Sequence, residues 1–581
     1  MGEARSGRGR ERLARYREAA DPLPKSYLSW DLYGAGIENL GRGGRPVEIP
    51  LRPPQPDEIL LRVDAVGLCF SDTKLIWAGA EHPRIRGRDL QKDPTVPGHE
   101  AALTVMAVGA NWRSRFARGQ RFIIQADIFI GGEQKAFGYV QRGAMAQYVY
   151  AGPWVLAGDA GCYLLPLQEK TGYAEAALVE PWACVEAAYH IASRQRPMPG
   201  GRLLIVFAGK RQADFSGLYA DGEAPAFTAV LGESEMDLTP VLGDCGVVKR
   251  FQPSPAAIEA LRQEGNGEGF DDIIIAGQVA PEIVRACDAA LSKKGMLIFA
   301  GSCEWPAAAL DIGRIHYHDT RHAGTATLCV REAYIANGRS EIRPRGAAWM
   351  IGAAGPMGQM HVQRALELET PPAQILATDI SAERLAYMRQ RLQPLAERKG
   401  VSLECLDVSR LPDLDSHLQR IAPRGWDDIV VLAPSAKLVE DAARFLGESA
   451  VLNIFAGVAP GTMANMPISI FPRLRCRVIG SSGSSLDDIK GVLKKLEAGQ
   501  LATRMSVAAI GGIDAVAEGL QAVKAGGFPG KIVIFPHLRL PLTGLDKVSA
   551  ICPEAAASLE RGDIWTNETE AALLAQLLAT D

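Results

Sequence analysis

The chain has 581 residues and a formal net charge of −4, with 47% apolar and 22% charged residues. That length is too great for one hydrophobic core and predicts about three or four domains. The charge gives no electrostatic reason to expect a nucleic acid, and no apolar run approaches the ~20 residues of a membrane span, so we expect a small-molecule partner.

The first 25 residues are charged and contain no apolar core, so they are not a secretory signal, and we expect residues 1–25 to be a flexible tail. The ten cysteines of the chain are scattered, without a paired framework. This pattern is typical of a reduced protein and predicts a cytoplasmic location.

Residues 26–194 begin as short β-rich segments such as "EILLRVDAVGL" and "AALTVMAVGA", separated by Gly and Pro. They predict a mostly antiparallel β domain. From about Thr171 the apolar residues take helical spacing, and "GRLLIVFAG" then opens a region in which strands alternate with helices. That alternation predicts βαβ units and a parallel sheet.

One phrase occurs twice in this region. "GFDDIIIAG" begins at Gly269 and "GWDDIVVLA" begins 156 residues later at Gly425. Aligned without a gap, 269–301 and 425–457 share ten identities in 33 positions, which indicates a duplication. We therefore predict two domains of one kind at 195–345 and 346–500, a segment at 501–540 that returns to the β domain, and a helical extension at 541–581.

The second copy opens with "AAWMIGAAGPMGQMHVQRALE", a buried strand followed by a glycine turn and a helix. This is the context that a dinucleotide-binding fingerprint requires, because glycine lets the backbone approach the pyrophosphate at the helix N-terminus. The next strand ends at Asp379, whose carboxylate can accept the ribose hydroxyls and repel a 2′-phosphate, which favours NAD(H) over NADP(H). The predicted cofactor-binding residues are Gly352, Ala353, Gly355, Pro356, Met357, Gly358, Asp379 and Arg384.

The first copy differs at the corresponding turn, "IVFAGKRQADFSGL". Lys210 and Arg211 stand where the cofactor would approach closely, and the next strand ends in "AVLGES" without an aspartate. We predict that this copy has lost the cofactor.

The β domain contains "GLCFSDTK", with Cys69, Ser71 and Asp72, and "VPGHEAAL", with His99 and Glu100. A thiolate and an imidazole are good zinc ligands, and a catalytic zinc needs a third protein ligand and one open position. The segment "VEPWACVEAAYH" offers three candidates for that third ligand, Glu180, Cys184 and His190.

With these motifs the chain resembles the zinc-dependent medium-chain alcohol and polyol dehydrogenases, in the branch of sorbitol dehydrogenase and L-sorbose-1-phosphate reductase. The resemblance rests on "GLCFSD", "PGHE", "VEP", "GAAGPMG" with Asp379, and the closing "AVAEGLQAVKAGGFPGKIVIF". It implies an α/β fold made of a GroES-like β domain and two tandem Rossmann domains, which are doubly wound parallel sheets. Family members have Gly at the positions of Ala102 and Ala353.

The resemblance also implies roles. Cys69, His99 and Glu180 would be the zinc ligands, with Glu100 behind the metal as a further or exchanging ligand. Ser71 would relay the substrate proton, and Asp72 would orient His99. Residues 101–150 contain no cysteine, so the structural zinc site of the family is absent and we expect one zinc per chain.

The implied activity is hydride transfer between NAD(H) and a polyol or ketose, phosphorylated or free, with a possible homo-oligomer and no nucleic acid or membrane partner. Basic segments, "GRDLQKDP" and "NWRSRFARG", could neutralise a substrate phosphate, although they read first as solvated loops. Two alternatives are a non-catalytic nucleotide-binding or scaffolding protein and a zinc-free enzyme similar to quinone reductase. Three histidines in "RIHYHDTRHAG" could suggest a second metal, but a basic surface loop is the favoured interpretation.

Overall fold

The computed structural model describes residues 2–209, 213–219, 223–232, 250–264, 267–335 and 338–578. The chain divides into two compact units. The first unit contains residues 1–186, 355–360 and 483–581, and the second contains 187–354 and 361–482.

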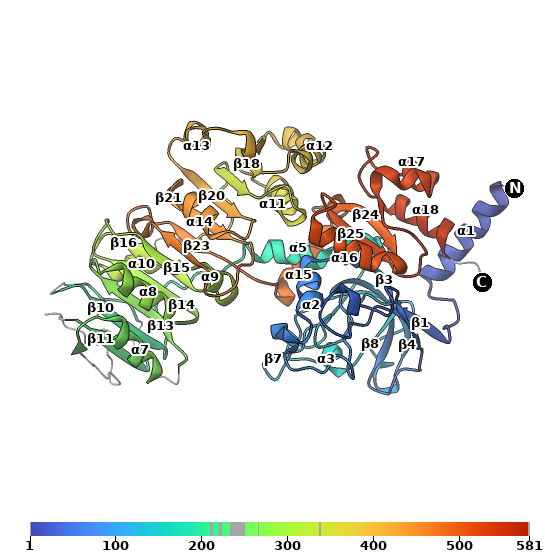
Figure 1. Ribbon diagram of the computed structural model, residues 1–581, viewed down its shortest axis with the longest axis horizontal. Coiled ribbons are helices and arrows are strands. Elements are labelled where there is room, and N and C mark those ends of the chain that lie inside the picture. The colour runs from blue at the N-terminus through green and yellow to red at the C-terminus, as the bar shows by residue number, and fades with distance from the viewer. Residues whose placement is uncertain are drawn as a thin grey trace. The chain divides into compact units, whose positions relative to one another are not determined.

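The first unit is built on an eight-stranded sheet in which β3, β4, β5 and β9 pair antiparallel, as the sequence predicts (Figure 1). The order is β26-β24-β25-β3-β4-β5-β9, with β8 also paired to β3. These strands are β3 (Ile59–Gly67), β4 (Glu100–Val108), β5 (Arg121–Ile124), β8 (Tyr148–Ala151), β9 (Leu164–Pro166), β24 (Val507–Gly512), β25 (Lys531–Phe535) and β26 (Thr543–Gly544). Strand β25 lies beside β3, so the chain returns to this sheet after it has formed the second unit.

Two small hairpins and a set of helices complete the first unit. The hairpins pair β1 (Ser26–Ser29) with β2 (Val47–Pro50) and β6 (Phe129–Ile130) with β7 (Glu133–Gln134). The helices are α2 (Phe70–Ala78), α3 (Pro153–Leu156), α4 (Tyr173–Ala177), α5 (Val179–Ala187), α15 (Leu486–Glu497), α16 (Val516–Ala525), α17 (Pro553–Ala557) and α18 (Asn567–Leu577). No helix among the described residues is both long enough and apolar enough to cross a membrane.

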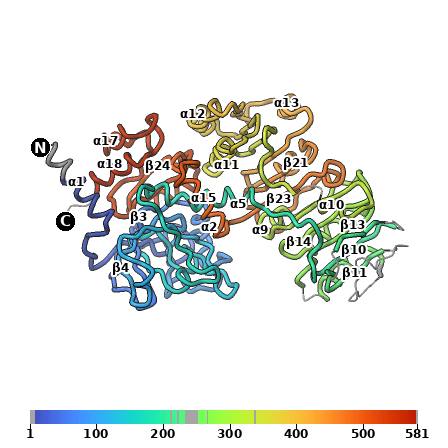
Figure 2. Tube along the Cα trace, turned by 180° about the vertical axis from the view of Figure 1, so that it is seen from behind, coloured from blue at the N-terminus to red at the C-terminus, as the bar shows by residue number. Residues whose placement is uncertain are grey.

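The N-terminal segment differs from the flexible tail expected for residues 1–25. It contains helix α1 (Gly2–Arg17), which lies beside α18 near the other end of the chain (Figure 2). Leu13 and Tyr16 are three residues apart and therefore lie on one face of this otherwise polar helix. Both side chains are buried. The helical extension predicted at 541–581 belongs to the first unit, where Glu570 accepts hydrogen bonds from the first backbone N–H groups of α4.

The second unit contains one sheet of twelve strands, in the order β12-β11-β10-β13-β14-β16-β23-β21-β20-β17-β18-β19. The first copy supplies β10 (Arg202–Phe207), β11 (Phe227–Leu231), β12 (Arg250–Phe251), β13 (Phe270–Ala276), β14 (Leu291–Ala300) and β16 (Arg321–Thr325). The second copy supplies β17 (Ala347–Ile351), β18 (Gln374–Asp379), β19 (Ser402–Asp407), β20 (Trp426–Val431), β21 (Leu446–Ile454) and β23 (Arg477–Ile479). Each half is parallel and has the doubly wound strand order of a Rossmann fold, which confirms the predicted fold class.

Helices flank these strands in both copies (Figure 1). They are α7 (Pro255–Gln263), α8 (Pro281–Ala289), α9 (Ile312–His318) and α10 (Val330–Ile335) in the first copy, and α12 (Ala382–Lys399), α13 (Leu414–Ile421) and α14 (Ala436–Ala443) in the second. Helix α11 (Pro356–Glu367) follows the glycine turn and its residues are shared between the two units.

The two copies meet about a local two-fold axis. Strands β16 and β23 pair antiparallel at His322 and Val478, and β15 (Ala308–Asp311) pairs antiparallel with β22 (Met463–Met466), with Ala309 opposite Asn465. Both pairs are separated by 156 residues, the offset of the repeat. Equivalent positions therefore face each other, as in the isologous interface of a symmetric dimer, and the two Rossmann copies form one sheet within one chain.

The repeated aspartates have a structural role in each copy. Asp272 accepts hydrogen bonds from Arg194 Nη1 at 2.8 Å and from the Met198 N–H at 2.8 Å. Its counterpart Asp428 accepts from the Arg339 guanidinium and the Arg343 N–H. Each aspartate thus ties the segment before the first strand of its copy to the sheet, which explains why the phrase occurs twice.

Candidate active site

Cys69 and Asp72 lie where β3 ends and α2 begins. The Asp72 Oδ2 atom accepts a hydrogen bond from the Cys69 N–H at 3.0 Å and so caps the helix with its third residue. The same carboxylate, through Oδ1, accepts from the Gly98 N–H at 3.1 Å and lies 3.0 Å from His99 Nδ1. Asp72 is fully buried and joins the two motifs that the sequence analysis singled out.

Glu100 begins the next strand, β4, and His99 directly precedes it. Gly98 before them has φ +98°, which a residue with a side chain would adopt only with strain. This turn carries the chain from its bond with Asp72 into the sheet. With Nδ1 of His99 held by the carboxylate, Nε2 is the nitrogen left to bind a ligand.

The Cys69 Sγ atom, a ring nitrogen of His99 and a carboxylate oxygen of Glu100 lie within 4.8 Å of one another. In the described part of the chain, no other group of three such side chains converges to this degree. Sulfur, imidazole nitrogen and carboxylate oxygen are the donor types that zinc takes in proteins, so the residues present fit a zinc ion.

Two further observations support that fit. Burial lowers the pKa of His99, but the Asp72 carboxylate raises it, and the resulting pKa is well above its ordinary value. The Asp72 carboxylate therefore makes the field at the site negative, which favours a bound cation, and a metal ion would replace the proton on Nε2 of His99. The Ser71 Oγ atom donates to Cys69 Sγ at 3.0 Å and lies 3.3 Å from His99 Nε2, so a hydroxyl group sits directly at the candidate metal position.

The sequence analysis missed Lys531, at the start of β25. Its buried ammonium group donates to Glu100 Oε1 and to the Leu68 carbonyl oxygen at 3.1 Å. The other oxygen of Glu100 is buried and has no hydrogen-bond partner among the described residues. The only sequence signal for Lys531 is a lysine at the start of an otherwise apolar strand, "KIVIF".

Glu180, the third ligand that the resemblance implies, lies on α5 and outside the group of three converging ligand atoms. Burial of its carboxyl group raises its pKa to about 7, with the charge of His99 acting in the opposite direction and that of Glu100 in the same direction. Glu180 is therefore close enough to His99 and Glu100 for their charges to act on its carboxyl group. Of the other candidates, Cys184 lies 3.8 Å from Glu180 through its Sγ atom, and His190 is exposed.

The predicted dinucleotide turn joins β17 to α11. Gly352 has φ +76°, which requires glycine, and a Cβ atom added to Gly355 would meet no atom within 4 Å. That open space is where a fingerprint of this kind receives a pyrophosphate. Ala353 is fully buried, Gly358 is buried too, and Pro356 and Met357 are half-buried in the first turn of the helix.

Asp379 ends β18 beside this turn. Its Oδ2 accepts from the Ala354 N–H at 3.0 Å, and its Oδ1 accepts from the Ile380 N–H at 2.8 Å. Arg384 Nη2 lies 3.6 Å from the same carboxylate. Of the predicted cofactor-binding residues, Arg384 thus lies beside Asp379, and the glycine turn reaches the same carboxylate through the Ala354 N–H.

The first copy retains a cavity of about 710 Å³ at the carboxyl ends of its strands, next to Phe207 and Gly232. Ligands bind at this end of the sheet in doubly wound folds. Lys210 and Arg211 lie outside the described residues, so the loss of the cofactor from this copy stays a prediction.

The sequence analysis favoured a basic surface loop for the three histidines of "RIHYHDTRHAG", and this prediction is wrong, because the segment forms helix α9 and strand β16. His316 on α9 and His322 on β16 are buried, because the junction of the two copies covers them. They are held apart by different partners: His316 Nδ1 lies 3.1 Å from the Ile454 carbonyl oxygen, and His322 Nε2 lies 2.8 Å from Asp288.

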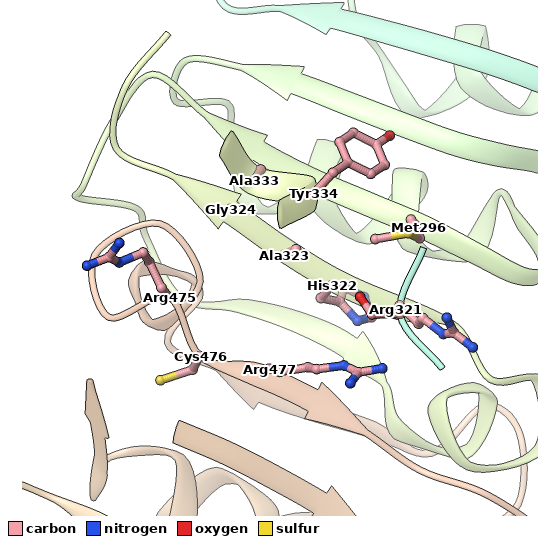
Figure 3. Close-up of a pocket in the computed structure, with 11 residues that line it drawn as sticks. Met296, Arg321, His322, Ala323, Gly324, Ala333, Tyr334, Arg475, Cys476 and Arg477 are labelled. Atoms are coloured by element: carbon pink, nitrogen blue, oxygen red, sulfur yellow. The ribbon is translucent and has the colours of Figure 1, made fainter. Parts of the chain in front are cut away.

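A cavity at this junction is too small for a substrate. It measures about 20 Å³, which is room for about one water molecule. The equivalent residues Arg321 and Arg477 extend in the same direction from β16 and β23 beside it (Figure 3). The Arg477 guanidinium donates to four backbone carbonyls, so the junction is a structural contact.

Comparison with known proteins agrees with this geometry. Residues 55–158 match the family model of the alcohol dehydrogenase GroES-like domain. L-sorbose 1-phosphate reductase from Klebsiella pneumoniae is 24% identical over 530 residues, which cover 90% of this chain and 92% of the relative. Mannitol-1-phosphate 5-dehydrogenase from Aliivibrio fischeri is 21% identical over 532 residues, 89% of this chain and 92% of the relative.

A shorter match is sorbitol dehydrogenase from Gallus gallus, 31% identical over 170 residues, which cover 28% of this chain and 44% of the relative.

Proposed function

Because the chain belongs to the zinc-type medium-chain alcohol and polyol dehydrogenases, we propose that it transfers a hydride between NAD(H) and a polyol/ketose pair in which the sugar carries a phosphate. The observation that carries the proposal is the convergence of Cys69, His99 and Glu100 with the Ser71 hydroxyl beside them. A scaffolding protein has no need of that set. The phosphate is supported by the similarity to two enzymes whose names specify sugar phosphates.

Cys69 and His99 would hold one zinc ion, with a carboxylate from Glu100 or Glu180 as the third ligand. A bound zinc supplies Lewis acidity at the substrate oxygen, and the nicotinamide supplies or accepts the hydride. Asp72 holds Nδ1 of His99, which sets the tautomer and the ring orientation. Lys531 balances the charge of Glu100 and keeps that carboxylate in place.

In the oxidative direction, Ser71 Oγ would accept the proton of the substrate hydroxyl as the hydride leaves the same carbon. The hydroxyl would then pass a proton toward solvent. In the reductive direction, the same oxygen would donate a proton to the substrate oxygen. No protein nucleophile takes part, and atoms and electrons balance between alcohol, oxidised cofactor, carbonyl, reduced cofactor and one proton.

The second Rossmann copy would bind the cofactor, with the pyrophosphate at the turn 352–358 and the ribose near Asp379. A carboxylate at this position repels a 2′-phosphate, so we expect a preference for NAD(H). Replacing Asp379 with Ala should reduce the ratio of NADH to NADPH turnover by about tenfold or more. An unchanged ratio would argue against the assignment of the cofactor to this copy.

The direct test is oxidation of NADH and NADPH by the purified protein against a panel of ketoses and ketose phosphates, with and without a zinc chelator. We expect NADH turnover that the chelator abolishes and that added zinc restores. The Cys69→Ser variant should lose both zinc and turnover. Turnover that is insensitive to the chelator in protein without zinc would favour the zinc-free alternative, and absence of both zinc and turnover would favour the scaffolding alternative.

A further inference from the structure

We propose that Arg84, together with His82, forms the subsite that binds the phosphate group of the substrate. This inference rests on the proposed function and adds the residues that select the substrate class. Both residues belong to the first unit, as do the zinc-ligand candidates.

Arg84 lies close to the candidate zinc site. Its guanidinium Cζ is 4.6 Å from the centroid of the Tyr139 ring, and that ring is 5.8 Å from the centroid of the His99 ring. One aromatic ring therefore separates the guanidinium from a zinc-ligand candidate. A phosphate bound at Arg84 would leave the reacting carbon of the same small sugar near His99 and Ser71.

The ring that supports Arg84 is rigidly placed. Tyr139 is buried, and its backbone carbonyl oxygen accepts a hydrogen bond from Thr95 Oγ1 at 2.6 Å. Its ring lies beside three other side chains, with centroid distances of 5.4 Å to His82 and 5.8 Å to His99 and with the Arg84 guanidinium 4.6 Å away. This arrangement fixes the phosphate subsite relative to the reacting atoms.

The Arg84 guanidinium has N–H groups that are available to bind a phosphate. Among the described residues, its side chain has one ion-pair partner, Asp127, at 3.1 Å from Nη2 to Oδ1. Asp127 also accepts from Gln134 Nε2 at 2.7 Å, which holds the carboxylate in position. About a third of the Arg84 side chain is exposed, and an arginine stacked on a ring can still bind phosphate through two parallel N–H groups.

His82 adds to this subsite. The His82 Nδ1 atom accepts from the Arg84 N–H at 3.3 Å, so Nε2 carries the proton and can donate to an oxyanion. Burial, followed by the charges of Arg84 and Lys74, lowers the pKa of His82 to about 4, so the imidazole is neutral at pH 7. The acidic groups that face Arg84 are Asp127 and Glu180.

The basic segments that the sequence singled out are less suitable. Arg88 of "GRDLQKDP" is occupied by Asp93 and by the carbonyl oxygens of Tyr139 and Val140. Arg118 of "NWRSRFARG" donates to carbonyl oxygens of the N-terminal segment. Arg84 combines proximity to His99 with unused donors.

The test compares the wild type with Arg84→Gln, Arg84→Lys and, as a matched control, Arg86→Gln, which removes an exposed arginine two residues away. Two quantities are measured. The first is the ratio of kcat/KM for D-fructose 1-phosphate to that for D-fructose, with NADH. The second is the binding of inorganic phosphate, from ³¹P NMR line broadening. Zinc content and thermal midpoint establish that each variant is folded and loaded.

We expect Arg84→Gln to reduce the kcat/KM ratio and the phosphate affinity by about 10- to 100-fold, because a charge-assisted bidentate contact is lost. Arg84→Lys should recover part of both, and Arg86→Gln should match the wild type. Equal ratios and equal phosphate affinities in Arg84→Gln and the wild type would overturn the inference.

The experiment distinguishes failure of the proposed oxidoreductase activity from failure of the phosphate subsite. If the wild type reduces free ketoses without preference for the phosphate ester, the proposed oxidoreductase survives and the phosphate subsite is refuted. If the wild type reduces neither sugar, the proposed function fails, and the phosphate-binding experiment still decides the subsite: weaker binding in Arg84→Gln alone supports it, and equal binding overturns it.

Discussion

At the scale of single residues, Asp72 organises the candidate site. One carboxylate accepts from the N–H groups of Cys69 and Gly98 and holds the ring of His99. Because it is buried, each of these hydrogen bonds is made in a region of low dielectric, where an unpaired group is costly. The two motifs that carry the chemistry are therefore fixed together before any ligand binds.

Gly67 provides the space for Glu100, and Gly67→Ala tests this. A Cβ atom at this position would collide with the Glu100 carboxylate, which is buried and cannot move aside freely. We expect the Glu100–Lys531 ion pair to break, zinc content to fall, and the free energy of unfolding to decrease by about 2 kcal/mol or more. Metal analysis and thermal denaturation measure both effects.

Gly152→Ala is the control for that variant. The nearest atom to its added Cβ is 4.0 Å away, and its φ of −100° suits any residue. It should retain zinc and stability. If Gly67→Ala behaves in the same way, Glu100 does not contribute to metal binding through this packing.

His361 makes stability depend on pH. It is fully buried on α11, accepts from the Tyr189 hydroxyl at 2.7 Å, and has its pKa lowered to about 3 by burial and by Arg364. An unfolded histidine titrates near 6.5, so between pH 6.5 and 3 the unfolded chain binds more protons and stability falls as the pH falls. The expected loss from this residue is about 2 kcal/mol between pH 7 and pH 5.

The His361→Phe variant removes this titration, so its thermal midpoint should change less between pH 7 and pH 5 than that of the wild type. It also loses the acceptor for Tyr189, which lowers the midpoint at both pH values. His190→Phe, at an exposed histidine, should keep the pH response of the wild type. An identical response in His361→Phe would show that His361 titrates normally.

At the scale of elements, the terminal helices α1 and α18 belong to the core of the first unit. Tyr16 of α1 covers the buried Arg62, whose guanidinium lies 3.5 Å from the ring centroid and pairs with Asp64 at 2.7 Å. The helix therefore shields an ion pair from water. Charge along "MGEARSGRGRERLARYR" favoured a solvated tail, because the buried positions are few and their partners lie elsewhere in the chain.

Tyr16→Ala tests the role of that helix. We expect the free energy of unfolding to fall by about 3 kcal/mol or more, because a large buried ring is lost and Arg62 is uncovered. Arg17→Ala, at an exposed neighbour, should stay within about 0.5 kcal/mol of the wild type. Thermal denaturation of the three proteins measures the difference. A small effect of Tyr16→Ala would mean that α1 is dispensable for the unit.

At the scale of the whole molecule, duplication has produced one sheet instead of two separate domains. The buried residues of the two copies form one continuous cluster that contains Ile273 of the first copy and Ile429 of the second. These residues are equivalent under the 156-residue offset. A common sheet and a common core predict that both copies unfold as one cooperative unit.

Ile273→Ala and Ile429→Ala test this cooperativity. Each removes a fully buried side chain, so each should destabilise by about 2 to 5 kcal/mol. In differential scanning calorimetry both variants should shift the same transition to lower temperature, and Leu61→Ala, in the core of the first unit, serves as the comparison. Separate transitions for Ile273→Ala and Ile429→Ala would show that the copies fold independently.

Much of the candidate site could be predicted from local motifs. Cys69, Ser71, Asp72 and His99 come together as the resemblance implies, and Asp379 accepts from the Ala354 N–H of the turn in the second copy. Lys531 could not be predicted, because it reaches Glu100 across 431 residues of sequence. Arg84 lies in a short 3-10 helix, Pro83–Ile85, whose sequence carries no motif, and the ring of Tyr139 connects it with His99.

By itself, the sequence determined the antiparallel β domain, the two Rossmann copies and the strand, glycine turn and helix that open the second copy. Each of these depends on the periodicity of apolar residues or on a short motif, and such local patterns express how one element buries its own face. Only the tertiary structure decided that the two copies share a sheet, that α1 is buried, and that Lys531 and Arg84 belong near the zinc-ligand candidates. Those features arise from pairing and charge balance between residues far apart in the chain, which no local pattern records.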